Sequence, residues 1–597
     1  MSHLSRYIKF ACIATVASMT FAAAHAQRAP AQQAPVTQTQ PPVGRPFISR
    51  IPIGPRYPLR NACEALKSLA LPNTVILSAE DNATGGFTPT IPPSPPGAPA
   101  IAGLPAYCRV VGKATPTATS TIGFEVWLPL GAAYNGRYEQ VGNGGFAGLV
   151  SYDGLGEGIR RGYATASTDD GHEGYQDSTF AQISHDKIVD FGWRALQQTT
   201  IAAKALIQAF YGAPPKYSYF FGCSDGGREA LMEAQRFPNE FDGIIAGAPA
   251  NAWTHQFTAL AYDTQMAYGH ALPFPAILPP AALSILSQGV RKQCVGKDGG
   301  LPGDLFLNDP RVCVIDWSKI QCAPGQNPAT CLNAAQVAAV EAIYAGAKNP
   351  AGQIYPGYEP GSEDADGGWQ LWITGPLGIG PFPTFGLQTF FGEGFFANFV
   401  YHVPVYNLMT LDMTSGLAAA DILAPDLNAT DSDLSAFRAH GGKLIQYAGW
   451  ADPGVAPQGG IDYYEAVRSA MALSYADEQG FYRLFMAPGM MHCSGGPGAN
   501  AFGNVTAPAA SPVDADHDVL MALARWREMG TAPDKIIATK YVNDNPAMGV
   551  AFQRPLCPYP QLGRYDGVSP DKTSAASFVC EARYVRPVRW PLEKAKP

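Results

Sequence analysis

The sequence predicts an α/β fold, in which a parallel β-sheet carries helices on both faces. Two observations support this fold class: strand-like and helix-like segments alternate from about residue 105 to 250, and the alternation resumes after residue 435. Repeated strand–helix–strand units are typical of parallel sheets. Residues 251–435 interrupt the pattern, so we predict one core domain made of residues 58–250 and 436–597, with 251–435 inserted as a second domain.

The first half of the predicted core contains five strands and two helices. Short apolar or aromatic runs bounded by Gly and polar turns indicate the strands, and apolar residues at helical spacing indicate the helices. Gly212 marks the end of the longer helix. The expected strands are IGFEVWLPL (122–130), RYEQV (137–141), YATAST (163–168), YSYFFG (217–222) and FDGIIAGAPA (241–250), and the expected helices are 194–212 and 227–238.

The second half of the core repeats the alternation with two strands, KLIQYAG (443–449) and FYRLFMAPG (481–489), and two helices, 459–473 and 517–530. The insertion between the halves is different in composition. It holds four clustered cysteines, many Gly and Pro residues, and the aromatic run GPFPTFGLQTFFGEGFFANF (380–399).

The N-terminus has the parts of an export signal. Arg6 and Lys9 precede the apolar segment ACIATVASMTFAAA (11–24), and Ala24–His25–Ala26 fits the small-x-small cleavage rule. The apolar run is shorter than the ~20 residues that a membrane-spanning helix needs, which disfavours an anchor. We expect residues 1–26 to be removed, the Pro/Gln-rich residues 27–57 to form a linker, and the protein to be periplasmic or secreted, without a membrane partner.

Composition narrows the classes of partner. The 597 residues are 46% hydrophobic and 15% charged, and the formal net charge is −8. This suits a large core and disfavours a nucleic-acid partner, since no basic patch is present. Eleven cysteines occur, and Cys12 leaves with the signal. The remaining ten predict five disulfides in an oxidising compartment, and no CxxC pair or His-rich cluster indicates a metal site instead.

A tight corner between a strand and a helix carries the first candidate catalytic residue. In FGCSDGGREAL (221–231), Ser224 stands between Gly222 and Gly226, directly after the apolar segment YSYFF. Glycines are needed where strand, turn and helix leave no room for a Cβ atom, and such a nucleophile elbow exposes the serine Oγ at the carboxyl edge of the sheet. The N–H groups that open the helix then face any oxyanion formed there.

A serine hydroxyl needs a base and an orienting acid to act as a nucleophile. In α/β-hydrolases the acid and then the histidine follow the serine along the chain. Asp452 in WADPG follows the predicted strand KLIQYAG, and His492 in MMHCSGG follows FYRLFMAPG. This order predicts a Ser224–His492–Asp452 triad on an α/β-hydrolase core. His172 and His185 precede the serine and are interpreted as structural.

Cysteines flank both the serine and the histidine. Cys223 precedes Ser224, and Cys493 follows His492. If the hydroxyl and the imidazole lie within hydrogen-bond reach, about 3 Å, the neighbouring backbones also come close. Disulfides need Cα atoms about 5.5–6 Å apart. We therefore predict a Cys223–Cys493 disulfide rather than two free thiols.

A glycine-rich loop, GNGGFAG (142–148), follows an early strand, where α/β-hydrolases place an oxyanion loop. We predict the backbone N–H groups of Gly145 and Asp225 as the two oxyanion donors. The alternative of an ordinary turn stays open. A nucleotide loop is disfavoured because no GxxxxGK[ST] pattern follows.

The segments around these residues resemble the tannase/feruloyl esterase family. The likeness rests on GCSDGGREALMEAQRFPNEFDGIIAGAPA, GWADPG, PGMMHCSGGPG and the late segments PLCPYPQLGRYDG and FVCEARY, and it extends from about residue 60 to the C-terminus. It implies a serine esterase triad on an α/β-hydrolase core, with a large lid domain between the strand ending near Pro249 and the strand before Asp452. It also implies the disulfides Cys223–Cys493, Cys63–Cys108, Cys294–Cys313, Cys322–Cys331 and Cys557–Cys580.

Lids of this family carry a calcium loop with three aspartates after a cysteine. The loop here, CVGKDGGLPGDLFLNDPRVC (294–313), is two residues longer and matches at Asp298, with Val295 and Pro302 in place of the other acids and Asp304 as a candidate substitute. Calcium prefers six or more oxygen ligands. We therefore expect no cofactor for catalysis and at most a weak structural calcium site in the lid.

The resembled family includes gallate and hydroxycinnamate esterases and the hydrolase of mono(2-hydroxyethyl) terephthalate, and the lid usually decides among these substrates. No Lys or Arg occurs from Asn349 to Phe437, whereas a free carboxylate on the acyl half of a substrate favours a cation. The resemblance places Trp372 at a substrate-facing position. We predict a small aromatic ester with an uncharged acyl group, of feruloyl or galloyl type. The alternatives are hydrolysis of terephthalate mono- or diesters, and a non-catalytic secreted binding protein of the same fold.

Overall fold

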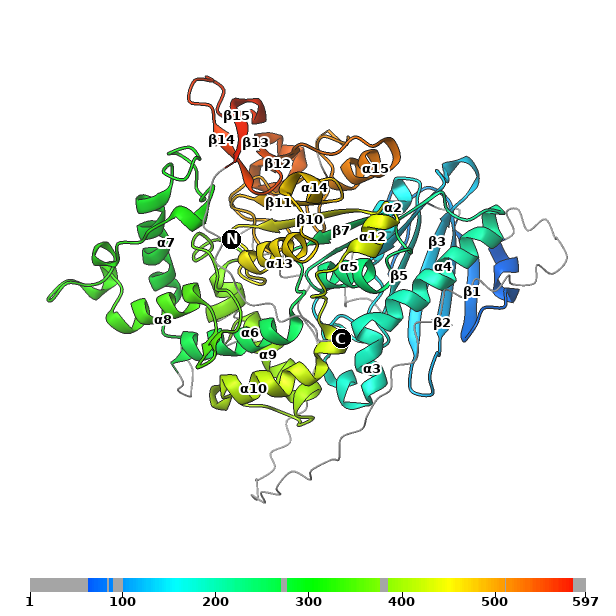
Figure 1. Ribbon diagram of the computed structural model, residues 1–597, viewed down its shortest axis with the longest axis horizontal. Coiled ribbons are helices and arrows are strands. Elements are labelled where there is room, and N and C mark those ends of the chain that lie inside the picture. The colour runs from blue at the N-terminus through cyan, green and yellow to red at the C-terminus, as the bar shows by residue number, and fades with distance from the viewer. Residues whose placement is uncertain are drawn as a thin grey trace, which may run out of the picture.

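The computed structural model of the protein describes residues 63–82, 85–89, 100–269, 276–375, 385–509 and 512–582. The expected export signal (1–26) and linker (27–57) lie outside the described residues. Figure 1 shows a central twisted sheet with helices on both faces, and a mainly helical part beside it. The α/β class predicted from the alternating segments is confirmed.

The central sheet has nine strands in the order β1-β2-β3-β5-β4-β6-β7-β10-β11. The strands from β5 to β11 run parallel, whereas β1, β2, β3 and β5 pair antiparallel. The predicted parallel sheet thus forms the centre, and an antiparallel edge extends it. The bounds are β1 Thr74–Asn82, β2 Tyr107–Ala114, β3 Ile122–Pro129, β4 Arg137–Val141, β5 Ala164–Thr168, β6 Tyr217–Cys223, β7 Gly243–Gly247, β10 Lys443–Gly449 and β11 Tyr482–Ala487.

Helices cover both faces because consecutive strand residues point to opposite sides. In β6, Phe220 packs into the cluster that includes α4, α5 and α13, while Phe221 belongs to the cluster on the other face, with α15. Helix α2 packs against Trp127 on that second face. The bounds are α2 Tyr152–Arg160, α3 His185–Val189, α4 Ala195–Tyr211, α5 Asp225–Arg236, α13 Pro457–Ala470, α14 Tyr475–Glu478 and α15 Val519–Met529.

The segment between β7 and β10 is mainly helical and has a cluster of buried side chains of its own, including Leu283, Leu286, Val340 and Ile343. In Figure 1 it forms the green to yellow part, on the side away from β1 and β2. The division of the chain at residues 250 and 436 stays a prediction. The elements are α6 Trp253–Tyr268, α7 Pro280–Cys294, α8 Ala334–Ala345, β8 Lys348–Asn349, β9 Gly352–Gln353, α9 Leu387–Gly394, α10 Met413–Ala420, α11 Ala424–Leu427 and α12 Ser435–Ala439.

Two antiparallel hairpins that the sequence does not predict follow α15. They are formed by β12 Ile536–Tyr541 with β13 Val550–Leu556, and by β14 Gln561–Tyr565 with β15 Phe578–Ala582. Phe552 of β13 stacks on Phe306, and Arg554 forms an ion pair with Asp304. The C-terminal hairpins therefore join the inserted segment to the end of the core.

Five disulfides link the described cysteines, in the pairs that the resemblance implies: Cys63–Cys108, Cys223–Cys493, Cys294–Cys313, Cys322–Cys331 and Cys557–Cys580.

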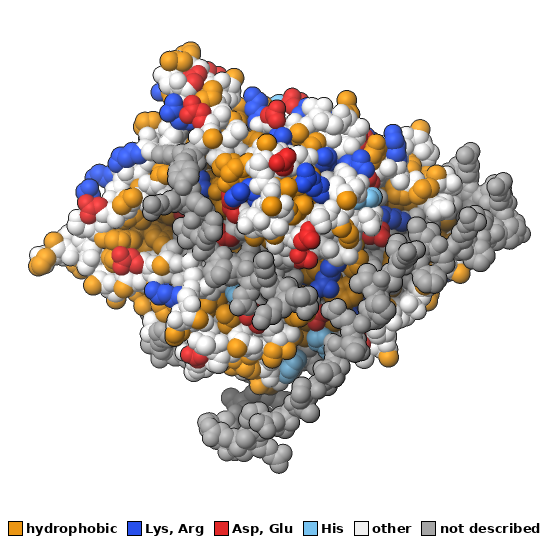
Figure 2. Space-filling model, in the orientation of Figure 1, with side chains coloured by type: hydrophobic (Ala, Val, Ile, Leu, Met, Phe, Trp, Pro, Cys, Tyr) orange, Lys and Arg blue, Asp and Glu red, His pale blue; other side chains and the backbone are white. Residues whose placement is uncertain are grey.

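Among the described residues, the helices are all too short or too polar to cross a bilayer. On the face seen in Figure 2, side chains of both charges are interspersed.

An ion pair between Arg161 and Asp518 connects the end of α2 to the start of α15. The Arg161 guanidinium, just after α2, donates to Asp518 Oδ1 and Oδ2 at 2.9 and 2.8 Å. The same carboxylate, whose side chain is 1% exposed, accepts the N–H groups of Leu520 and Met521 and so caps α15. Asp518 serves as both ion-pair partner and helix cap.

We expect Asp518→Ala to lower the free energy of unfolding by about 2–4 kcal/mol, because it removes a helix cap and the closest ion-pair partner of the largely buried Arg161, which keeps only a longer contact with Glu157. Asp516→Ala is the matched control, since its carboxylate is 62% exposed and pairs with Arg525 at the surface. That variant is expected to lose less than about 1 kcal/mol. Urea unfolding followed by tryptophan fluorescence measures both, and equal losses would contradict the prediction.

Candidate active site

The corner between β6 and α5 places Ser224 at the carboxyl edge of the sheet. Its backbone has φ 67° and ψ −120°, a strained conformation for a residue with a side chain. A Cβ atom on Gly222 would lie 2.2 Å from the Gly226 carbonyl oxygen, and one on Gly226 would lie 2.7 Å from that of Asn143. The glycines predicted at this corner are therefore required by the close approach of strand, helix and loop.

The structure brings Ser224, His492 and Asp452 together. The Ser224 Oγ lies 2.8 Å from His492 Nε2, and His492 Nδ1 lies 3.0 and 2.9 Å from the two carboxylate oxygens of Asp452. His492 follows β11 and Asp452 follows β10, so both come from loops at the carboxyl edge. In this arrangement the carboxylate holds the imidazole, and the imidazole can accept the hydroxyl proton.

The loop that carries Asp452 is held from two sides. Within the loop, Asp452 Oδ1 accepts the N–H groups of Gly454 and Val455 at 2.8 and 2.9 Å. From the inserted segment, the amides of Gln388 and Gln256 donate to the carbonyl oxygens of residues 453 and 454 at 3.0 and 3.3 Å. The inserted helices α9 and α6 thus help to fix the acid.

A disulfide closes the site at the sheet edge. Cys223 and Cys493 are bonded, with Cα atoms 6.0 Å apart. Cys493 has φ 63°, so both the serine and the residue after the histidine have left-handed backbones. The covalent bond therefore joins the two strained loops directly beside the hydroxyl–imidazole contact.

The glycine-rich loop lies against the start of α5. The Gly226 N–H donates to the Asn143 carbonyl oxygen at 3.0 Å, and Gly145 has φ 63°. Neither the Gly145 nor the Asp225 N–H, the predicted oxyanion donors, makes a hydrogen bond to another group in the described part of the chain. Both N–H groups are therefore available for a ligand.

Gln176 holds this loop and is a residue that the sequence did not reveal. Its side-chain oxygen accepts the Phe146 N–H at 2.7 Å, and its amide donates to the Gly144 carbonyl oxygen at 2.8 Å. These two bonds bracket Gly145. A glutamine 31 positions after the glycine has no local sequence signal that would have marked it.

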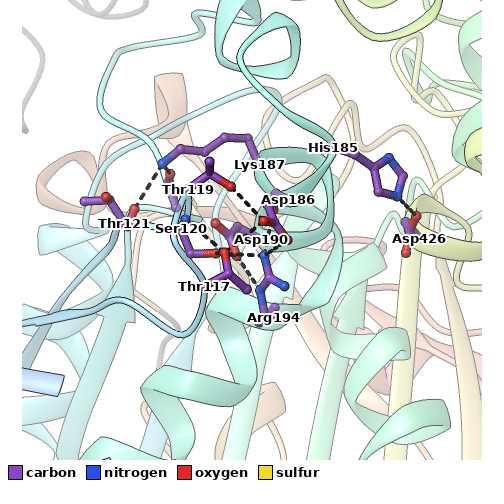
Figure 3. A network of polar contacts seen from close by, with 11 residues as sticks. Thr117, Thr119, Ser120, Thr121, His185, Asp186, Lys187, Asp190, Arg194 and Asp426 are labelled. Atoms are coloured by element: carbon purple, nitrogen blue, oxygen red, sulfur yellow. Dashed lines mark hydrogen bonds and ion pairs between the residues drawn. The ribbon is translucent and has the colours of Figure 1, made fainter. Parts of the chain in front are cut away.

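The two histidines interpreted as structural have other partners. His172 Nε2 lies 2.9 Å from the Phe146 carbonyl oxygen, and burial lowers the pKa of His172 to about 4, so that the ring is neutral at pH 7. His185 is exposed and lies 3.1 Å from Asp426 (Figure 3). Neither contact involves Ser224.

Aromatic side chains extend from the histidine to the oxyanion loop. Trp372 meets His492 edge-on, with ring centroids 4.9 Å apart, and stacks near Phe391 at 6.2 Å. Phe391 in turn meets Phe146 edge-on at 5.5 Å. Trp372 and Phe391 are partly exposed. Phe391 and Phe146 are additions to the predicted site, because an aromatic-rich sequence does not show which ring turns inward.

A buried cation close to the serine, Arg228, already has partners within the protein. Arg228 is 0% exposed, pairs with Asp225, and donates to the carbonyl oxygens of Gly192 and Phe191. No Lys or Arg lies between residues 349 and 437. This side of the site therefore has aromatic surface rather than positive charge.

The loop 294–313 does not fit calcium. Asp298 accepts the N–H groups of Gly300 and Asn308, and Asp304 accepts the Leu301 N–H and pairs with Arg554. N–H donors and a guanidinium thus occupy the carboxylates where a cation would need them. The side chains of Val295 and Pro302 supply no oxygen.

Comparison with known proteins agrees with the geometry. Residues 108–581 match the family described as tannase and feruloyl esterase. An uncharacterized esterase of Xanthomonas campestris pv. campestris is 41% identical, covering 87% of this chain and 91% of the relative, and feruloyl esterase C of Talaromyces stipitatus is 31% identical, covering 85% and 92%. The crystal structure of feruloyl esterase B from Aspergillus oryzae superposes with a TM-score of 0.78 at 27% identity, covering 88% and 100%.

The disulfide at the site predicts a large loss of stability on its removal. Cys223 and Cys493 are 270 positions apart, whereas Cys322 and Cys331 are 9 apart. Because closing a longer loop removes more entropy from the unfolded chain, we expect Cys223→Ser/Cys493→Ser to cost about 5 kcal/mol and Cys322→Ser/Cys331→Ser about 3 kcal/mol. Chemical unfolding of the two variants beside the unmodified protein tests this order, and a larger loss in the second variant would contradict it.

Proposed function

The chain belongs to the tannase and feruloyl esterase family, and we propose that it is a serine esterase that cleaves esters of aromatic acids of the feruloyl or galloyl type. The observation that carries the proposal is the 2.8 Å contact between Ser224 Oγ and His492 Nε2, with Asp452 on the other ring nitrogen. As a member of this family it is a carboxylic ester hydrolase. The serine mechanism and the substrate class are what we add.

The first half of the proposed reaction forms an acyl-enzyme. His492 Nε2 takes the proton of Ser224 Oγ as the oxygen attacks the ester carbonyl carbon, and Asp452 stabilises the imidazolium. The carbonyl oxygen becomes an oxyanion that accepts hydrogen bonds from the Gly145 and Asp225 N–H groups, each worth a few kcal/mol. His492 then gives its proton to the leaving alcohol oxygen as the carbon–oxygen bond breaks.

The second half releases the acid. A water molecule takes the place of the alcohol, His492 removes one of its protons, and the hydroxide oxygen attacks the acyl carbon. The bond to Ser224 Oγ breaks, and the serine recovers its proton from His492. The products are the aromatic acid and the free enzyme, and no cofactor takes part.

The aromatic arc of Trp372, Phe391 and Phe146 supports an aromatic acyl group. The partly exposed rings of Trp372 and Phe391 extend from the imidazole to the buried Phe146 of the glycine-rich loop, and we expect the acyl half of the ester to bind against them. Aromatic surface without a cation favours an uncharged group, since a buried carboxylate without a partner is costly. The five disulfides support action in an oxidising compartment, the periplasm or the medium.

A serine-directed phosphonate should label the protein once, and Ser224→Ala should abolish both labelling and hydrolysis of methyl ferulate, because the Ser224 hydroxyl is paired with the imidazole of His492. Ser218→Ala, a buried serine on the same strand, is the control and should keep both. Mass spectrometry counts the label. An unmodified protein that takes no label would instead indicate a non-catalytic binding protein.

The lid composition predicts a preference for uncharged acyl groups. We expect kcat/KM to be at least about ten-fold higher for a terephthalate diester than for the corresponding monoester, whose free carboxylate has no cation to bind. Trp372→Ala should raise KM for both esters several-fold, and Trp372→Phe should restore most of the loss. Steady-state kinetics on the matched pair decides, and preference for the charged monoester would overturn the substrate class.

A further inference from the structure

Three buried carboxyl groups lie behind the oxyanion loop. Asp170, Asp225 and Glu229 are at most 1% exposed, and one oxygen of each lies within 4.8 Å of the others. Within the described part of the chain, the cation that pairs with one of these acids is Arg228, which binds Asp225. One guanidinium therefore faces three acids in a site without access to water, and the remaining pair, Asp170 and Glu229, has no cation of its own.

Glu229 and Asp170 each accept a hydrogen bond from Asn143, one from its backbone N–H and one from its side-chain amide. The Glu229 carboxylate accepts the Asn143 backbone N–H at 3.0 Å, and the Asp170 carboxyl accepts the side-chain amide at 2.7 Å. The same amide donates to the Thr168 carbonyl oxygen at 2.8 Å. Asn143 opens the loop that leads to Gly145, so the pair determines where that loop begins.

The second oxygen of each acid is left without a donor. Asp170 Oδ1 and Glu229 Oε1 are buried, and neither accepts a hydrogen bond from a described N–H or O–H group. Two adjacent buried carboxylates cannot both be ionised, because desolvation and mutual repulsion oppose the second charge. A proton held between them supplies the missing donor. Burial, and then the neighbouring negative charges, raise the pKa of both groups.

We propose that Asp170 and Glu229 share one proton, and that this carboxyl–carboxylate pair positions the oxyanion loop through Asn143. The inference rests on the proposed esterase function and adds positioning residues to it. Loss of the shared proton at alkaline pH places two negative charges side by side, separates the carboxyls and displaces the loop that carries Gly145. The oxyanion is then held less well, so kcat falls while KM changes little.

The positive charge of Arg228 acts on the pair and lowers the pKa of Glu229, but Arg228 is itself paired with Asp225, and the other charged groups nearby do not supply a counter-charge. Lys187 donates to the carbonyl oxygen of Gly171 at 2.5 Å and so holds the turn that carries Asp170. Its positive charge interacts with the carboxylates of Asp190 and Asp169, and both interactions raise the pKa of Lys187 against the lowering effect of burial. Asp190 also pairs with Arg194. The titratable and charged groups that face the pair or its turn are Asp225, Arg228 and Glu233 of α5, Asp169 and His172 of the turn, Lys187 of α3, and Asp190 of the following π-helix turn Asp190–Arg194.

The decisive variant is Asp170→Asn, whose amide imitates a permanently protonated carboxyl. Its NH₂ donates to Glu229, and its oxygen accepts from Asn143. We expect kcat of this variant on methyl ferulate at pH 6 to stay within about three-fold of the unmodified enzyme, and the alkaline fall in kcat to move up by at least about one pH unit. Asp170→Ala should lower kcat at least about thirty-fold across the whole pH range, with KM within about three-fold.

Glu233→Gln is the matched control. Glu233 lies one helical turn after Glu229 on α5, is 0% exposed and also has two carboxyl oxygens without donors. Its carboxyl interacts electrostatically with that of Glu229 but makes no contact with Asn143 in the described part of the chain, so its substitution should shift the alkaline fall in kcat much less than Asp170→Asn does. Thermal unfolding of each variant separates a loss of stability from a loss of positioning.

Two results would overturn the inference. The first is an Asp170→Asn enzyme that keeps the alkaline fall of the unmodified protein. The second is an infrared difference spectrum between the two proteins without the C=O band of a protonated carboxyl, a measurement that needs no turnover. Failure of the unmodified protein to hydrolyse any aromatic ester would count against the proposed function instead, and the infrared band would still decide whether the proton is shared.

Discussion

The close approach of β6, α5 and the glycine-rich loop is the constraint on which the site depends. Gly222 and Gly226 leave no space for a side chain, and the Gly226 N–H bonds to Asn143 across the contact. This compression forces Ser224 into a left-handed backbone and turns its hydroxyl out of the sheet. The oxyanion loop and the nucleophile thereby become one rigid unit, which His492 then meets from the other side.

The inserted segment is part of the catalytic geometry as well as its cover. Gln388 and Gln256 bond to the loop of Asp452, and Trp372 packs against Gly454 and the histidine ring. The same inserted helices therefore contact both the loop of Asp452 and the ring of His492. If the proposed esterase mechanism holds, a change of side chain at Trp372 affects the alignment of Asp452 as well as the space next to the imidazole.

The features that the sequence reveals are those with a local signature. Motifs of a few residues indicate the glycines around Ser224 and the alternation of strands and helices. They also indicate that Asp452 and His492 each follow a strand. The antiparallel edge of the sheet and the C-terminal hairpins are harder to predict, because strands that are largely exposed, such as the nine-residue β1, have little apolar periodicity. Side chains such as Gln176, Phe391 and Asp170 act through contacts with partners far along the chain, and only a structure brings these together.

The long interval between Cys223 and Cys493 has a consequence for how the protein is made. During synthesis the nucleophile corner emerges first, and its sulfur partner is produced only after the whole inserted segment. Meanwhile Cys294, Cys313, Cys322 and Cys331 appear and can close short loops, which cost less entropy to form. The Cys223–Cys493 bond therefore becomes available only after the inserted segment and its two short disulfides have been made, and before Cys557 and Cys580 appear.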